Sequence, residues 1–155
     1  MQISVIIAAA GSACRMGCPG NKALLPLMGQ PVLSWSLQLF EQTPEVTEII
    51  IAARPEDMDE IKAIVSHYPK VKALTAGGNS RAASVQHALA EVAANCSHIA
   101  VHDAARPLLS PADWRALLTE AAQGPEGAIL ACPARDSIRS HDGYFLDSVL
   151  DRDTL

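Results

Sequence analysis

The sequence predicts an α/β protein with a mostly parallel sheet flanked by helices. Short apolar runs rich in β-branched residues recur along the chain, and segments with helical periodicity, about 10–15 residues long, separate them. Parallel strands need crossovers of this length, and such crossovers are right-handed. With 155 residues, of which 49% are hydrophobic and 19% are charged, the chain is expected to form one domain with a single core.

Each apolar run bounded by turn residues is expected to be a buried strand. The five strands expected in this way span residues 3–7, 48–53, 71–76, 98–101 and 127–131. Helices are expected where Pro31, Ser80 and Ser110 supply a first-turn proline or an N-cap, and after Arg54. These helices span residues 30–40, 55–67, 81–94 and 110–122.

After Pro133 the pattern changes to that of a β-hairpin. Asp142-Gly143 lies between runs in which apolar and polar residues alternate, which is a signal for a hairpin. The chain is therefore divided into an α/β domain, residues 1–134, and a β-arm, residues 135–155. The hairpin has more apolar surface than it can cover alone, so we expect the arms of two chains to pair in a homodimer.

The loop after the first strand reads AAAGSACRMGCPGNK at residues 8–22. Small side chains let successive backbone N–H groups converge on phosphate oxygens, and the residues concerned are Ala8, Ala9, Ala10 and Gly11. Arg15 and Lys22 add two cations beside them. A triphosphate needs both N–H donors and neutralising charge, so the loop is predicted to bind one.

Two other phosphate motifs do not fit this loop. A dinucleotide fingerprint, G-x-G-x-x-G, that began at Gly11 would need glycines where the chain has Ala13 and Met16. A Walker A loop needs a lysine directly after its last glycine, and Gly17 is followed by Cys18. Neither a dinucleotide site of that type nor a P-loop is expected.

Two further loops follow strands and should reach the same site, because ligands bind beyond the carboxyl ends of parallel strands. In the first, paired glycines precede a helix N-terminus that favours an anion or a base carbonyl. Its candidate nucleotide-binding residues are Gly77, Gly78, Arg81 and Ser84. The alternative for this segment is a plain turn followed by a capped helix.

The second of these loops is V-H-D-A-A-R-P at residues 101–107. Asp103 at the end of a strand suits Mg²⁺, which takes one or two carboxylates together with substrate phosphates. Arg106 suits an acceptor phosphate through the fork of its guanidinium, and His102 is expected to be a structural hydrogen-bonding residue. Alternatively, Asp103 and Arg106 form a surface ion pair that contributes little.

The first loop resembles the signature A-A-G-x-G-x-R-M-G, followed by Lys, of nucleotidyltransferases with a Rossmann-like fold, although Ala13 replaces the second glycine. With G-G-x-x-R-x-x-S-V and V-H-D-A-A-R-P in this order, the chain from Ile3 to about Arg152 resembles the 2-C-methyl-D-erythritol 4-phosphate cytidylyltransferases of the non-mevalonate isoprenoid pathway. The resemblance implies a Rossmann-like nucleotidyltransferase fold with a protruding β-hairpin arm. It also implies transfer of CMP from CTP to that polyol phosphate, with release of pyrophosphate and formation of 4-diphosphocytidyl-2-C-methyl-D-erythritol.

The resemblance assigns roles to individual residues. It implies that the loop of Ala9, Ala10, Gly11 and Ser12 holds CTP together with Gly77, Gly78 and Ser84. It implies that Arg15 and Lys22 are catalytic, stabilising the triphosphate and the transition state, and that Asp103 serves both Mg²⁺ and the acceptor. The implied acceptor-binding residues are Asp103, Arg106, Ser137 and Arg152, of which Arg152 would reach the partner subunit's site. The family continues beyond this sequence with a second catalytic lysine and a threonine, which have no counterpart in these 155 residues.

Three other functions stay open on the sequence. Another polyol-phosphate cytidylyltransferase, such as one that uses ribitol phosphate, would share the fold. A molybdenum-cofactor guanylyltransferase would share it too, but that family usually reads L-A-G-G where this chain has Ala8 to Gly11. A nucleotide-binding fragment without turnover, acting through its dimer, is the alternative from a different class.

Composition and charge indicate which classes of partner and which cellular compartment to expect. The net charge of −5 argues against nucleic acid as a partner, because a phosphate backbone is bound by basic surfaces. No apolar run approaches the roughly 20 residues of a membrane span, and no secretory leader pattern is present, so a cytoplasmic protein is expected. The four cysteines are expected to be reduced thiols without a zinc site.

Overall fold

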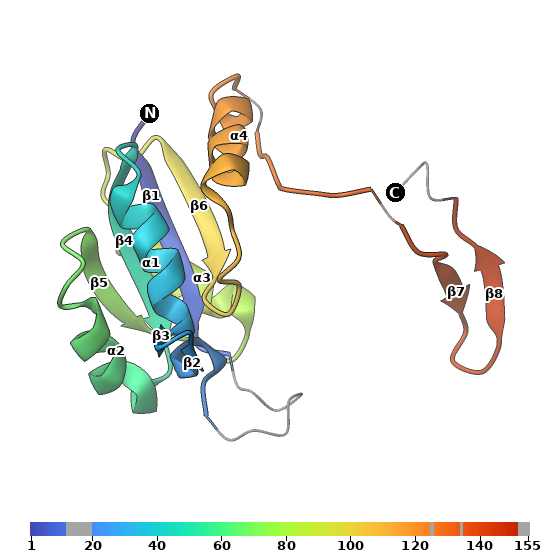
Figure 1. Ribbon diagram of the computed structural model, residues 1–155, viewed down its shortest axis with the longest axis horizontal. Coiled ribbons are helices and arrows are strands. Elements are labelled where there is room, and N and C mark those ends of the chain that lie inside the picture. Colours follow the sequence, from blue (N-terminus) through green and yellow to red (C-terminus); the bar gives the residue numbers. More distant parts are fainter. Residues whose placement is uncertain (12–19, 125, 134, 152–155) are drawn as a thin grey trace. The chain divides into compact units, whose positions relative to one another are not determined.

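The computed structural model of the protein describes residues 1–11, 20–124, 126–133 and 135–151. The chain folds as two compact units, Met1–Pro111 and Ala112–Leu155, and each is described by itself (Figure 1). The predicted division into a nucleotide-binding domain, 1–134, and a dimerising arm, 135–155, concerns function and stays a prediction.

A four-stranded parallel sheet forms the centre of the first unit. Its strands are β1 (Ile3–Ala9), β4 (Val46–Ala53), β5 (Val71–Ala76) and β6 (His98–Asp103), in the spatial order β5-β4-β1-β6 (Figure 1). In the register of the sheet, Ile6 of β1 pairs with Ile50 of β4 on one side and with Val101 of β6 on the other. Four of the five predicted strands are confirmed.

Helices connect these strands, as expected for βαβ units. After β1 comes α1 (Val32–Gln42), after β4 come the 3-10 helix η3 (Pro55–Asp57) and α2 (Met58–Val65), and after β5 comes α3 (Arg81–Leu89). Right-handed crossovers that run in opposite directions along the sheet, here from β1 to β4 and from β5 to β6, put their helices on opposite faces. Accordingly, α1 lies in front of the sheet in Figure 1 and α3 lies behind it. Within the described ranges, no helix has both the length and the apolar character that a membrane span requires.

The predicted helix 81–94 is wrong at its C-terminal end, because α3 stops at Leu89. Ser80 caps its start as expected, and the hydroxyl oxygen accepts a hydrogen bond from the Ala83 N–H at 3.0 Å. Beyond Leu89, the N–H of Ala93 donates instead to the carboxylate of Glu48, a buried residue of β4, at 2.9 Å. A distant side chain thus takes the backbone donor that a longer helix would have used, which local propensity does not reveal.

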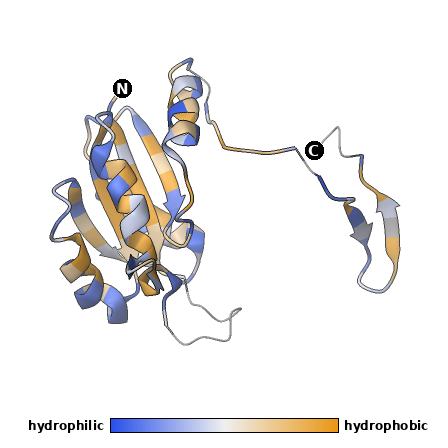
Figure 2. Ribbon diagram, viewed as in Figure 1, coloured by the Kyte–Doolittle hydropathy of each residue, from blue (hydrophilic) through white to orange (hydrophobic). Residues whose placement is uncertain are grey.

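The core lies on both faces of the two central strands, β1 and β4, which Figure 2 shows as largely hydrophobic. On one face, Ile6, Ile50 and Ala52 pack with Ala88 of α3. Strand side chains alternate between faces, so the intervening residues serve the opposite side of the sheet. There α1 contributes its buried apolar residues, Leu33, Leu37 and Phe40. A sheet buried on both faces provides a rigid platform for the loops at the strand ends.

A small hairpin precedes α1 where the sequence predicted the first helical turn. Its strands are β2 (Pro26–Leu27) and β3 (Gln30–Pro31), and the 3-10 helix η2 (Lys22–Leu24) leads into it. Met28 and Gly29 at the turn have φ values of 50° and 85°, as a type I′ turn requires. The predicted helix 30–40 therefore begins two residues later, at Val32.

The second unit contains most of α4 (Pro111–Ala121) and the hairpin formed by β7 (Arg139–His141) and β8 (Leu146–Val149). The predicted hairpin is confirmed, and the four residues 142–145, which include Asp142-Gly143, connect its strands. Oδ1 of Asp142 accepts hydrogen bonds from the N–H groups of Tyr144 at 2.9 Å and Phe145 at 2.8 Å, while Gly143 adopts a φ of 106°. These contacts hold the pKa of the Asp142 carboxyl below its usual value.

The predicted fifth strand, 127–131, is wrong, because these residues form a connecting segment that pairs with no strand in the described part of the chain. Ile129 is 86% exposed. An apolar run becomes a strand only when a neighbouring strand accepts its backbone hydrogen bonds, and within the described residues the sheet ends at β6. Instead, residues 127–130 and α4 line an open groove of about 480 Å³.

Candidate functional site

The carboxyl ends of β1 and of the edge strand β6 lie side by side in the sheet. From β1 the chain crosses first to β4 and then to β5, and it later returns as β6 on the other side of β1. The winding direction therefore reverses between β1 and β6. Ala8 stands level with Asp103, and the N–H of Ala104 donates to the carbonyl of Ala8 at 3.0 Å. In sheets of this type a ligand binds in the crevice beyond such a point. The loops predicted to carry the site begin there.

Two arginines converge on the carboxylate of Asp103, the last residue of β6. Nε of Arg81, in the first turn of α3, lies 2.8 Å from Oδ1, and Nε of Arg106 lies 2.9 Å from Oδ2. Arg81 is 22 residues from Asp103 in the sequence. The predicted convergence of the second and third loops is thus confirmed for these residues. The structure also confirms the ion pair between Asp103 and Arg106, which the sequence analysis gave as an alternative.

The exposure of this triad suits ligand exchange. The side chains of Arg81 and Arg106 are 60% and 77% exposed, and that of Asp103 is 30% exposed. Exposed ion pairs contribute little to stability, so a phosphate can compete for both guanidinium groups. Burial raises the pKa of Asp103, but the hydrogen bond and charge of Arg81, with the charge of Arg106, outweigh it and hold that pKa below its usual value. Asp103 is therefore an anion at neutral pH.

The glycine loop between β5 and α3 is packed tightly against the other strand ends. The N–H of Gly77 donates to the carbonyl of Ala53 at 2.8 Å, and the N–H of Gly78 donates to the hydroxyl of Ser84 at 3.0 Å. Ser84 is buried, and its hydroxyl donates to the carbonyl of Ser80 at 2.9 Å. Ser84 thus holds the loop in shape. Its direct contact with a nucleotide stays a prediction.

His102 has the structural role expected for it. Its Nε2 lies 2.8 Å from the hydroxyl of Ser36 in α1, and its ring packs edge-on against Phe40 with the centroids 5.2 Å apart. Burial lowers the pKa of His102, so the ring is neutral at neutral pH. This contact ties β6 to α1 at the residue that precedes Asp103.

Of the remaining predicted site residues, some are described by the structure and others lie outside the described ranges. Ala9 ends β1, Ala10 and the exposed Gly11 follow it, and the half-buried Lys22 begins η2. Ser12, Arg15 and Arg152 lie outside the described residues. Ser137 is exposed and belongs to the second unit. The roles proposed for these residues stay predictions.

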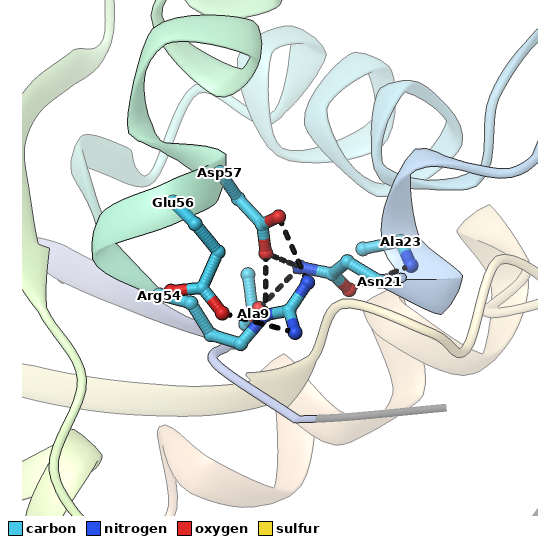
Figure 3. Close-up of polar contacts among 6 residues, drawn as sticks. All are labelled: Ala9, Asn21, Ala23, Arg54, Glu56 and Asp57. Atoms are coloured by element: carbon cyan, nitrogen blue, oxygen red, sulfur yellow. Dashed lines mark hydrogen bonds and ion pairs between the residues drawn. The ribbon is translucent and has the colours of Figure 1, made fainter. Parts of the chain in front are cut away.

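Sequence reasoning missed a polar cluster at the carboxyl ends of β1 and β4, formed by Asn21, Arg54 and Asp57 (Figure 3). The Asn21 amide donates to the carbonyl of Ala9 at 2.7 Å and to Oδ2 of Asp57 at 2.8 Å. A signal was available, since Arg54 and Asp57 follow a buried strand at a spacing of three residues. Nothing in the sequence pairs Asn21 with them, because 36 residues separate it from Asp57.

The model of the 2-C-methyl-D-erythritol 4-phosphate cytidylyltransferase family matches residues 3–155. The chain belongs to this family. A curated cytidylyltransferase of this name from Symbiobacterium thermophilum is 44% identical over 88% of the chain, and one from Shewanella oneidensis is 40% identical over 99%. The chain spans only 57% and 61% of the length of these two relatives.

Solved structures of the family share the fold. The 4-diphosphocytidyl-2C-methyl-D-erythritol synthase of Anaerococcus prevotii superimposes with a TM-score of 0.84 at 26% identity, over 98% of this chain and 65% of that one. The cytidylyltransferase of Francisella tularensis gives a TM-score of 0.74 at 26% identity, over 100% of this chain and 68% of that one. The Rossmann-like nucleotidyltransferase fold predicted for the chain is thereby confirmed.

Proposed function

We propose that the chain is a cytidylyltransferase that transfers CMP from CTP to 2-C-methyl-D-erythritol 4-phosphate, in isoprenoid biosynthesis. The observation that carries this proposal is the meeting of Arg81, Asp103 and Arg106 beside the end of β1, in a chain of this family. Two guanidinium groups around one carboxylate suit a reaction between two phosphate-bearing substrates, because both substrates are anions.

The reaction needs positioning and charge neutralisation more than acid–base chemistry. An oxygen of the acceptor's phosphate attacks the α-phosphorus of CTP in line, and a new P–O bond forms. The bond from the α-phosphorus to the β-phosphate oxygen breaks, and pyrophosphate leaves with the electron pair. Lys22, with Arg15, would stabilise the charge on the triphosphate, while the backbone from Ala9 to Ser12 and the Gly77-Gly78 loop would hold the nucleotide.

Asp103 is the residue that would hold Mg²⁺. Its carboxylate has about four lone-pair sites, of which the two arginine contacts use two, so oxygen sites remain for a metal. One protein carboxylate completed by substrate phosphates and water is a common way to bind Mg²⁺. When bound, the ion would neutralise phosphate charge. Arg106, Ser137 and the partner's Arg152 would bind the acceptor.

The arm, residues 135–155, is proposed to join two chains in a homodimer in the cytoplasm. Four apolar residues of the hairpin are more than half exposed: Tyr144, Phe145, Leu146 and Val149. Exposed apolar residues gathered in this way mark an interaction surface, and the same hairpin of a second chain would cover them around a two-fold axis.

Binding and turnover can be tested separately on the purified protein. Isothermal titration should show CTP binding in the presence of Mg²⁺ and much weaker binding of GTP. A coupled pyrophosphate assay should then show turnover with 2-C-methyl-D-erythritol 4-phosphate and not with ribitol 5-phosphate. Turnover with ribitol phosphate, or a preference for GTP, would replace this proposal with one of the alternative transferases. CTP binding without turnover would leave a nucleotide-binding protein.

A further inference from the structure

One buried side chain, that of Asn21, holds three backbone and side-chain groups together (Figure 3). Its Nδ2 donates to the carbonyl oxygen of Ala9 and to Oδ2 of Asp57, at 2.7 and 2.8 Å. Its Oδ1 accepts from the N–H of Ala23 at 3.0 Å and thereby caps η2. Asn21 is only 6% exposed, so water cannot replace these partners cheaply. Its orientation is therefore fixed by the groups around it.

Asp57 is held just as firmly from the other side. Arg54 donates to both of its oxygens, from Nε to Oδ2 at 2.7 Å and from Nη2 to Oδ1 at 2.8 Å. Asp57 is 8% exposed, and a carboxylate so deeply buried is costly unless its charge is paired and hydrogen-bonded. Arg54 also contacts Glu56 at 3.2 Å, but the Glu56 side chain is 63% exposed. The bidentate contact with Asp57 is thus the strong one.

The position of this cluster gives it a consequence for the reaction. Ala9 is the last residue of β1, and Lys22 follows Asn21 directly as the first residue of η2. Through Asn21, the backbone that carries Lys22 is tied to the end of β1 and, through Asp57 and Arg54, to the end of β4. Both strands belong to the rigid core of the sheet.

We propose that Arg54, Asp57 and Asn21 form a clamp that positions Lys22 against the triphosphate of the bound nucleotide. This inference rests on the proposed function, which gives Lys22 its task. Arg54, Asp57 and Asn21 are positioning residues, because they act through the backbone at Lys22. Transition-state stabilisation depends on placement to within about 1 Å, so loosening the clamp slows the chemical step more than it weakens nucleotide binding.

The sharpest test is Asp57→Asn in the purified native protein, with Glu56→Gln as the matched control. The amide has one acceptor oxygen where the carboxylate uses two, so at least one contact of Arg54 or Asn21 is lost. We expect kcat to fall about tenfold or more while KM for CTP changes by less than about threefold. Glu56→Gln also loses a contact of Arg54, yet it should leave both constants at their wild-type values.

Amide hydrogen exchange supplies a readout that does not depend on turnover. In Asp57→Asn, the amides of Ala23 and Leu24 should exchange about tenfold faster, while those of Ile6 and Ile50 in the sheet keep their protection. If Asp57→Asn does not fold, Arg54→Lys keeps the charge pair, loses the fork, and should give the same pattern.

The clamp is overturned if the folded variants retain wild-type kcat, or if kcat falls without any change in exchange at Ala23. Loss of CTP affinity equal to the loss of kcat would also overturn it, since that result indicates a general defect. Failure of the proposed function would appear differently. The wild-type protein itself would then prefer GTP, use ribitol phosphate, or release no pyrophosphate with CTP and 2-C-methyl-D-erythritol 4-phosphate.

Discussion

The β-carbon that Gly77 lacks would lie 2.3 Å from the β-carbon of Ala10. Real β-carbons do not approach this closely, so the loop after β5 and the loop after β1 are in contact only because residue 77 is glycine. The same glycine donates its N–H to the carbonyl of Ala53 at the end of β4. Three strand ends therefore meet at one small residue.

Gly77→Ala should consequently disturb both the fold and the site. We expect a loss of about 1–3 kcal/mol in the free energy of unfolding, which is typical of overpacking, together with weaker CTP binding. Urea denaturation and isothermal titration measure the two effects. Gly127→Ala is the control, because a β-carbon there meets nothing within 4 Å. Equal unfolding midpoints for both variants would contradict the prediction.

Lys22→Ala should reduce turnover by about 100-fold or more with a modest loss of CTP affinity. The reason is that the ammonium charge matters most where negative charge develops in the transition state. Steady-state kinetics and titration of the native protein with CTP measure the two quantities. Lys72→Ala removes an exposed lysine that contacts the carbonyl of Pro69 and provides the comparison. Near-normal turnover of Lys22→Ala would rule out the catalytic role.

Asp103→Asn should weaken the dependence of CTP binding on Mg²⁺. The neutral amide loses the charge that attracts the metal, while it keeps the size of the side chain. Titrations with CTP at increasing Mg²⁺, followed by the same series for Asp113→Asn in α4, measure the difference. If the two variants depend on Mg²⁺ equally, Asp103 serves the acceptor or the structure instead.

The pH dependence of stability should contain a contribution from Asp57. Burial raises the pKa of Asp57, but the hydrogen bonds from Arg54 and Asn21 outweigh it and hold that pKa below its usual value of about 3.9. Its contribution is therefore fully present above the unfolded pKa and is lost as the pH falls through the folded pKa. Urea denaturation between pH 7 and pH 3 should show a steeper loss for the wild-type protein than for Asp57→Asn. If the free energy of unfolding falls equally with pH in both proteins, the prediction is contradicted.

Phe145→Asp in the hairpin should convert the proposed homodimer to a monomer. A charge placed in the apolar surface that two arms would share loses its water without gaining a partner. Sedimentation velocity at micromolar concentration measures the change. Met28→Asp, at an equally prominent apolar residue of the first unit, should remain dimeric. A wild-type protein that sediments as a monomer would remove the arm's proposed role.

The parts of the fold that the sequence predicted correctly depend on local patterns. β1, β4, β5 and β6 are apolar runs between turn residues, and Ser80 and Asp142 act on backbone groups two or three residues away. The errors lie where distant groups decide. Residues 127–131 need a neighbouring strand, and beyond the end of α3 the N–H of Ala93 donates to Glu48 of β4 and not to a helical carbonyl.

The same physical distinction divides the candidate site. The sequence by itself determined that Asp103 ends a strand, that Arg106 follows it within reach, and that small residues and Lys22 follow β1. Only the tertiary structure decided that Arg81 shares the carboxylate of Asp103 and that Asn21 joins Ala9 to Asp57. Those partners lie on separate segments of the chain. The order and register of the parallel strands set the distances between these partners. No single stretch of residues encodes that order or that register.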